Sequence, residues 1–361
     1  MAQIRNPINP NTTIDLGSVL EVINPQYGRI DQSGLFEEQG ITSLAHMYKI
    51  VDQGQTKMTK LTSRTERDAM AVEKAKEKYV TMAGVTIKEV GGVHVEDLIG
   101  VVTGGLDFES DSFQEALIKE ATRMANVGAA NMEYVKLTAT QGSVLDPYNG
   151  TVAINQYANT GTTRSTATIT AGATDDLLGS LTALRNQIEQ LNGYNGNIGE
   201  IEIILGETAF NAIVTHPDLA TLYQLAYSGF GPAALQQPVL NGTLALQQKD
   251  RYGFSREFRW FDGGLVFRTY PQKFYRWDGT AVDAVAANKG WTIVHGVSGL
   301  YQVKYTPAPY VSKYNQAGQK WVARSTGIID DTHADMTIES HLIPFMSRPE
   351  MSVDITVTTS L

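Results

Sequence analysis

The 361-residue chain contains no cysteine, which excludes disulfide bonds, thiolate metal sites and cysteine nucleophiles. It also lacks an excess of positive charge, because 29 Lys and Arg face 38 Asp and Glu and the net charge is -9. Proteins that grip nucleic acid gain most of their affinity from Lys and Arg that neutralise phosphates, so tight binding of DNA is not predicted. No run approaches the roughly 18 apolar residues that a membrane helix needs. The first residues lack the apolar core of a secretory signal, so we expect the protein to stay inside the cell that makes it.

Sequence motifs for catalysis are missing as well. The six histidines are scattered singly, and the chain has no His-Glu-x-x-His pair, no phosphate-binding loop and no Gly-x-Ser-x-Gly elbow. The nearest approach, Gly296-Val297-Ser298-Gly299, lacks the residue that should separate the serine from the closing glycine. An acidic group could gather a metal, but its spacing fits no standard calcium loop; it consists of Asp330, Asp331, His333 and Asp335. We therefore predict no catalytic residue, no cofactor and no metal site.

What the chain does have is the composition of a globular protein. Hydrophobic residues make up 42% and charged residues 19%, and the length suits one large or two ordinary domains. Residues 1–42 differ from the rest, since they are rich in Asn, Pro, Gly and Gln. Such a segment has little means of burying itself, so it is interpreted as an arm that lies on another surface.

Residues 43–95 comprise two strand-like pieces around a strongly charged middle. Ser63 and Glu66 match a helix capping box, and strong helix formers continue to Tyr79, which predicts a short helix within this charged stretch. A solvated helix on any globular surface would give the same pattern. An isolated two-stranded hairpin is marginal in water, so a segment of this length needs a partner surface.

Three further patterns predict regular elements. Helical spacing from Ser112 predicts a rod of nearly thirty residues that stops at Gly142. Gly128 lies inside this helix, where glycine costs about 1 kcal/mol relative to alanine, and a close packing contact or a bend would explain its presence. A second helix is predicted between Asp175 and Gly193. The strand 201–205 and a helical pair interrupted at Pro217 come next.

The remaining segments are predicted to be mainly strands. Residues 228–250 have weak periodicity and are interpreted as a loop. Aromatic strand-like pieces follow between residues 265 and 310, and the chain closes on an alternating, half-buried strand that contains Val353, Ile355 and Val357.

The last third of the chain carries a pattern of specific residues: a strand that ends in Pro-Ala-Pro, an Asn-x-x-Gly turn, an acidic loop, Glu-Ser, an apolar group with Pro, and Arg-Pro before the terminal strand. The positions are Pro307, Ala308, Pro309, Asn315, Gly318, Glu339, Ser340, Pro344, Arg348 and Pro349. Two more blocks begin at Asn131 and Gly206. In order and spacing these blocks resemble the lambda-type major capsid protein E family of tailed phages.

The resemblance implies an α+β subunit of the Hong Kong 97-type capsid fold. Its expected parts are an N-terminal arm (1–42), an extended flap loop (43–95), a peripheral domain with the long spine helix (96–170), an axial α/β domain (171–300) and the C-terminal strands of the peripheral β-sheet (301–361). Copies would assemble as hexamers and pentamers into an icosahedral shell. The shell would form in the host cytoplasm and become the virion capsid, enclosing double-stranded DNA without sequence-specific binding.

The resemblance also implies partners. Scaffold, portal and decoration proteins are expected, with no membrane and no enzymatic activity. Candidate intersubunit contacts are the cations of the flap: Lys57, Lys60, Arg64, Arg67, Lys74, Lys76 and Lys78. The alternative is a cellular nanocompartment of the encapsulin type, which uses the same fold to enclose a cargo enzyme.

Overall fold

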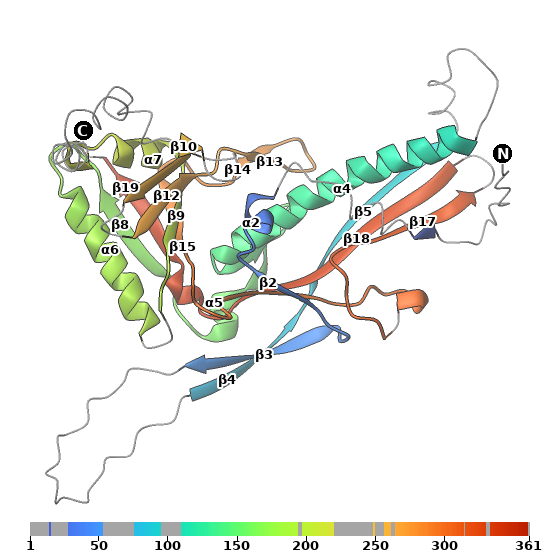
Figure 1. Cartoon of the computed structure of the whole chain (residues 1–361), viewed down its shortest axis with the longest axis horizontal. Coiled ribbons are helices and arrows are strands. Elements are labelled where there is room, and N and C mark those ends of the chain that lie inside the picture. The colour runs from blue at the N-terminus through green and yellow to red at the C-terminus, as the bar shows by residue number, and fades with distance from the viewer. Residues whose placement is uncertain are drawn as a thin grey trace, which may run out of the picture. The chain divides into compact units, whose positions relative to one another are not determined.

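The computed structural model describes residues 14–15, 28–52, 76–94, 110–193, 197–219, 248–249, 256–260, 264–313, 315–329 and 333–359. The chain divides into two compact units, and Figure 1 labels their helices and strands. Unit 1 consists of Met1–His46, Thr81–Lys136 and Gln302–Pro344, and unit 2 of Met47–Val80, Leu137–Tyr301 and Phe345–Leu361. Among the described helices none is long and apolar enough to cross a membrane.

Unit 1 is built on a six-stranded sheet in the order β1-β17-β18-β16-β2, with β5 also paired to β18. The strands are β1 (Ile14–Asp15), β2 (Glu37–Gly40), β5 (Val85–His94), β16 (Tyr301–Tyr305), β17 (Val322–Ile329) and β18 (His333–Met346). Strand β2 runs parallel to β16, whereas β5 is antiparallel to β18 over ten residue pairs. The short 3-10 helix η1 (Val311–Lys313) follows β16.

The long helix α4 (Ser110–Thr140, 31 residues) confirms the predicted rod. At about 1.5 Å per residue it is roughly 46 Å long. Its apolar face packs on the six-stranded sheet through one buried cluster, which comprises Val93, Leu117, Ala121, Met124, Ala323, Ala334, Met336 and Ile338. Gly128 has the close contact that was one of its two predicted explanations, because a Cβ there would lie 2.8 Å from Cη2 of Trp321.

Part of the predicted N-terminal arm is folded into unit 1. The one-turn helix α2 (Arg29–Gln32) has Arg29 and Ile30 buried. The carboxylate of Glu133 on α4 accepts hydrogen bonds from the backbone N–H groups of Ile30 (2.7 Å) and Asp31 (3.0 Å). These two N–H groups belong to the first turn of α2 and have no partner within the helix, so Glu133 on α4 satisfies them.

Unit 2 is built on a seven-stranded mixed sheet in the order β10-β11-β12-β9-β15-β19-β8 (Figure 1). Its strands are β8 (Ser165–Thr170), β9 (Ile201–Leu205), β10 (Gln248–Lys249), β11 (Arg256–Trp260), β12 (Leu265–Thr269), β15 (Lys289–Val294) and β19 (Val353–Thr358). Every residue of β9 and β12 is buried, and β9 confirms the strand that was predicted over residues 201–205.

Helices of unit 2 pack on that sheet. Helix α6 (Leu177–Asn192) contacts β8, and α7 (Glu207–Val214) contacts β12 and β19. Helix α6 confirms the predicted second helix: the Asp176 side chain caps it by accepting from the Gly179 N–H at 2.8 Å, and it ends at Gly193, whose φ is 58°. Three two-stranded ribbons are also present: β3 (Ala45–Asp52) with β4 (Lys76–Ala83), β6 (Ser143–Leu145) with β7 (Val152–Asn155), and β13 (Lys273–Tyr275) with β14 (Ala281–Asp283). The short helices α5 (Gln156–Thr160) and η2 (Pro349–Met351) complete the described elements.

One expectation needs correction. The helix predicted to continue to Tyr79 is wrong for residues 76–79, which form the first half of β4; the rest of that predicted helix lies outside the described residues. The terminal strand is confirmed as an alternating, half-buried strand, and β19 joins the seven-stranded sheet of unit 2. Alternating hydrophobicity shows that a segment is a half-buried strand, whereas the choice of sheet depends on backbone pairing between distant residues.

Candidate functional site

The root of the predicted flap is the ribbon formed by β3 and β4, and one of its faces is buried. Tyr48 stacks on Phe345 with the ring centroids 4.0 Å apart, and burial raises the pKa of the Tyr48 hydroxyl. Val80 and Met82 are also buried. Because side chains alternate along a strand, this spacing assigns the residues between them to the other face.

The other face of the ribbon is exposed and partly apolar. Met47 is 59% exposed and Tyr79 is 55% exposed. The Lys49 ammonium group forms an ion pair of 2.7 Å with the Glu77 carboxylate, and the Tyr79 hydroxyl donates a hydrogen bond of 3.1 Å to the same carboxylate. Large apolar side chains on an exposed ribbon are typical of a surface that another protein covers.

The structure describes two of the seven candidate cations, and their role between subunits stays a prediction. Lys76 opens β4. Lys78 Nζ donates a hydrogen bond to the backbone carbonyl of Thr160, so this ammonium group is used inside unit 2. The other five lie outside the described residues: Lys57, Lys60, Arg64, Arg67 and Lys74.

Signature residues of the last third form hydrogen-bonded hubs. Glu339 on β18 accepts a hydrogen bond of 2.6 Å from the Tyr310 hydroxyl and an ion pair of 3.0 Å from Lys88 on β5. Nε2 of His341 lies 3.1 Å from the second carboxylate oxygen of Glu339. Burial alone would raise the pKa of Glu339, but the bonds from Tyr310, Lys88 and His341 outweigh it, and the pKa lies below its usual value. The guanidinium of Arg324 lies over the Tyr310 ring at 4.5 Å.

The Asn-x-x-Gly turn has a steric reason. Asn315 is the one non-glycine residue with positive φ (61°) among the residues described, and Asn tolerates that conformation better than most residues. A Cβ on Gly318 would lie 2.2 Å from the carbonyl oxygen of Tyr305, so only glycine fits where the backbone approaches β16. The signature therefore specifies a tight turn packed on the six-stranded sheet.

Arg348 ties the end of α6 to the segment before β19. Its guanidinium donates to the Asn192 side chain at 3.0 Å and to the backbone carbonyls of Leu191 and Asn192. Carbonyls in the last turn of a helix have no partner in the helix, and a cation there is favoured by the helix dipole. Pro349 then takes the first position of η2, where a proline loses no hydrogen bond.

A buried ion cluster that the sequence did not reveal holds α2 against α4. Lys136 on α4 is fully buried and pairs with Asp31 and with Glu38. Lys320 also reaches Asp31, at 2.7 Å. Burial alone would raise the pKa of Asp31, but the charges and hydrogen bonds of Lys136 and Lys320 outweigh it and lower the pKa below its usual value.

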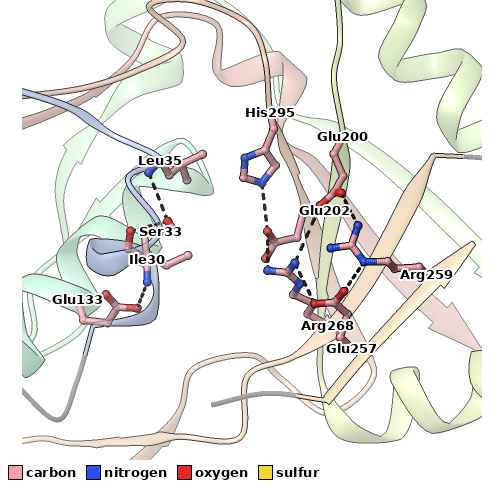
Figure 2. Close-up of polar contacts among 10 residues, drawn as sticks. All are labelled: Ile30, Ser33, Leu35, Glu133, Glu200, Glu202, Glu257, Arg259, Arg268 and His295. Carbon is pink, nitrogen blue, oxygen red and sulfur yellow. Dashed lines mark hydrogen bonds and ion pairs between the residues drawn. The ribbon is translucent and has the colours of Figure 1, made fainter. Parts of the chain in front are cut away.

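A second polar row crosses the seven-stranded sheet (Figure 2). Arg268 on β12 lies 3.0 Å from Glu257 on β11 and 3.4 Å from Glu202 on β9. His295, just after β15, lies 3.1 Å from Glu202. These contacts join four neighbouring strands, so the row stabilises the sheet from side to side.

Arg259 extends the row at its outer end (Figure 2). It lies 2.8 Å from Glu200 and also pairs with Glu257. Burial alone would lower the pKa of Arg259, but the two carboxylates raise it above its usual value. No sequence pattern predicted this row or the buried Lys136, because their members come together only through tertiary pairing.

These polar groups are structural by their geometry. Their carboxylates are matched to cations, and within the described ranges no group of three or more His, Asp or Glu could hold a metal ion. The predicted acidic group lies partly outside those ranges; His333 and Asp335 are both on β18, 3.9 Å apart. Each polar group therefore stabilises the unit in which it lies.

Comparison with known proteins identifies the family. The sequence profile of the Phage major capsid protein E family matches residues 12–357. The chain is 22% identical over 357 residues to the major capsid protein of Salmonella phage Felix O1 (isolate Felix O1-VT1), covering 94% of this chain and 95% of that protein. A protein assigned as a prophage capsid protein in Escherichia coli CFT073 shares the fold, with a TM-score of 0.56 and 11% identity over 96% of this chain and all of that one. The chain therefore belongs to the phage major capsid protein E family: it is a major capsid protein, a structural protein of the phage head.

Proposed function

We propose that the chain forms the head as hexamers and pentamers of a Hong Kong 97-type subunit, and that the ribbon of β3 and β4 is the root of a flap that reaches a neighbouring copy. The observation that carries the proposal is the two-sided character of this ribbon. Tyr48 anchors one face, whereas Met47 and Tyr79 are exposed on the other. A two-stranded ribbon with an unburied apolar face gains stability when a partner covers it.

The proposal assigns a part of the capsid subunit to each unit. Helix α4 with the six-stranded sheet would be the peripheral domain with its spine, and the seven-stranded sheet with α6 and α7 would be the axial domain. The net charge of -9 suits a wall around double-stranded DNA, because a lining that neutralised phosphates would hold the genome in place. Scaffold, portal and decoration proteins would join this shell during head formation.

Neutralising three flap cations tests the intersubunit role. The change is Arg64, Arg67 and Lys74 to Gln in one variant. We expect the subunit to keep its thermal unfolding midpoint, because cations that act between subunits contribute to assembly and not to the folding of the single subunit. The yield of shells, measured by sedimentation, should fall, and more so at low salt, where these charges are less screened.

A matched variant controls for the loss of net charge. It replaces three cations elsewhere in the chain by Gln: Arg123, Arg185 and Lys313. Shell yield should stay normal in this control. If both variants assemble equally well, the flap charges have no intersubunit role. If the first variant unfolds, that segment belongs to the core of the subunit.

A further inference from the structure

The aromatic side chains that are most exposed among the described residues occur at the turns of two hairpins in unit 2. Trp277 is 86% exposed and Tyr275 is 70% exposed, both in the β13–β14 hairpin. Tyr148, in the β6–β7 turn, is 64% exposed. Trp and Tyr are large apolar groups that usually lose most of their exposure, so three of them at turns need an explanation.

The β13–β14 hairpin has one buried and one exposed face. Phe274 is 9% exposed and stacks against Tyr270, with the ring centroids 6.2 Å apart. Tyr275 is paired with Ala281, and Lys273 with Asp283, on the opposite face. The inner face therefore anchors the hairpin to unit 2, and Tyr275 has no such role.

The turn that carries Trp277 is held in one conformation. Gly279 N–H donates to the Arg276 carbonyl at 2.9 Å, and Arg276 N–H donates to the Thr280 carbonyl at 3.0 Å. The Asp278 side chain accepts from the Thr280 N–H at 2.8 Å, and Gly279 takes a φ of +81°, which favours glycine. A turn fixed in this way presents its side chain with little further loss of backbone entropy on binding.

The β6–β7 turn is fixed by similar bonds and lies against the first. Asp146 N–H donates to the Thr151 carbonyl, and Gly150 N–H donates to the Asp146 carbonyl, both at 2.8 Å. A Cβ on Gly150 would lie 2.3 Å from Nη2 of Arg276. The guanidinium of one turn therefore lies on the backbone of the other, and the two tips adjoin.

We propose that these adjoining tips form a docking knob, defined as Tyr148, Tyr275, Arg276 and Trp277, which inserts into a second copy of this chain in the assembled head. Trp, Tyr and Arg are the residue types that most often dominate binding at protein interfaces. Covering the three aromatic side chains would bury roughly 300–600 Å². That area is a large share of the about 800 Å² that each partner contributes to a standard interface.

A second copy is the fitting occupant because the head is made of this chain. Neighbouring identical subunits that are not related by a twofold axis meet through different surfaces, so an element of one copy contacts a different surface of the next. A rigid aromatic projection is suited to such a contact. The inference rests on the proposed assembly into multi-subunit rings and names residues for one of its contacts.

Removing the aromatic groups tests the knob. The variant Tyr275→Ser with Trp277→Ser should keep its circular dichroism and its unfolding midpoint, because both side chains are exposed in the subunit. The lowest subunit concentration that yields particles should rise about tenfold or more, as expected for the loss of dominant interface residues. The control is Val311→Ser, since Val311 is 98% exposed and lies outside the knob; its threshold should stay normal.

Cross-linking from a single introduced cysteine identifies the partner. Because the natural chain contains no cysteine, the cross-linker attaches at that one position. In the variant Ala281→Cys, the new thiol is the only one in the chain and lies across from Tyr275. A photoreactive maleimide attached there should join two copies of the chain in assembled particles and not in unassembled subunits. The matched control is Ala183→Cys, at an exposed position on α6.

Each outcome distinguishes the two levels of the inference. If wild-type particles form and the serine variant assembles at the normal threshold, the knob is refuted and the proposed shell assembly stands. Cross-links to another head protein in place of a second copy also refute it. If the wild-type chain forms no particles in any salt or scaffold condition, the proposed assembly fails and the knob fails with it.

Discussion

Strand β19 is predicted to be necessary for the folding of unit 2. It lies between β15 and β8 in the seven-stranded sheet, so its loss leaves β8 without its only strand partner in the described sheet. Val353, Ile355 and Val357 are 0%, 1% and 5% exposed. At about 1.5–3 kcal/mol for each buried side chain, their burial contributes roughly 4.5–9 kcal/mol. That sum is comparable to the whole unfolding free energy of a domain, about 5–15 kcal/mol.

Two variants distinguish a partial from a complete loss of the stability that β19 contributes. Ile355→Ala should lower the unfolding free energy by about 2–5 kcal/mol, the usual range for truncating a buried Ile. Deleting residues 351–361 should abolish the cooperative transition. Thr358→Ala is the control on the same strand, because Thr358 is exposed; it should change stability by less than about 0.5 kcal/mol. Calorimetry and urea unfolding measure all three. A soluble deletion variant with native circular dichroism and a cooperative melt would refute the reasoning.

Two other predictions concern unit 1. Gly128→Ala should destabilise by about 0–2 kcal/mol, because the gain in helix propensity, about 1 kcal/mol, opposes an overpacking cost of about 1–3 kcal/mol against Trp321. When Trp321→Leu is made in the same chain, Gly128→Ala should become stabilising. A coupling energy of zero between the two substitutions would contradict the contact. Asp31→Asn should cost about 2–3 kcal/mol, since it removes one partner of buried Lys136 but leaves Glu38. The pKa of Asp31 is lowered in the folded state, so its contribution is complete well above the ordinary carboxyl pKa of about 3.9 and is lost as the pH falls through and below it. Urea unfolding from pH 7 to pH 3 should show a smaller acid loss in Asp31→Asn than in wild type.

Local patterns predicted the regular elements of this fold well. The strand 201–205 was predicted at its observed bounds, and both major helices at nearly theirs, because capping residues and apolar spacing act within a few residues. The helix that was predicted to reach Tyr79 failed at its described end. Residues 76–79 have helix-forming composition, but pairing with β3 and burial of Val80 outweigh a propensity of a few tenths of a kcal/mol per residue.

The polar clusters could not be predicted for a different reason. Asp31, Lys136 and Lys320 lie in three separate parts of the sequence, and each alone has the appearance of a surface charge. Only pairing makes a fully buried Lys tolerable, and pairing is a property of the folded chain. The family signature was more informative, since residues such as Gly318 and Arg348 report close backbone approach and carbonyl capping that local spacing does not show.

The pairing of β8 with β19 also determines when, during synthesis of the chain, the seven-stranded sheet can be completed. Ser165 is in register with Val353, so a ribosome must add nearly the whole second half of the chain before β8 finds this partner. At about 5–20 residues per second, that interval is roughly 10–40 seconds. During it, β8 offers an open edge to other nascent chains, which is a known route to aggregation. In a cell that makes many copies at once, we expect protection of this unfinished sheet, more than the stability of the finished subunit, to limit the supply of material for heads.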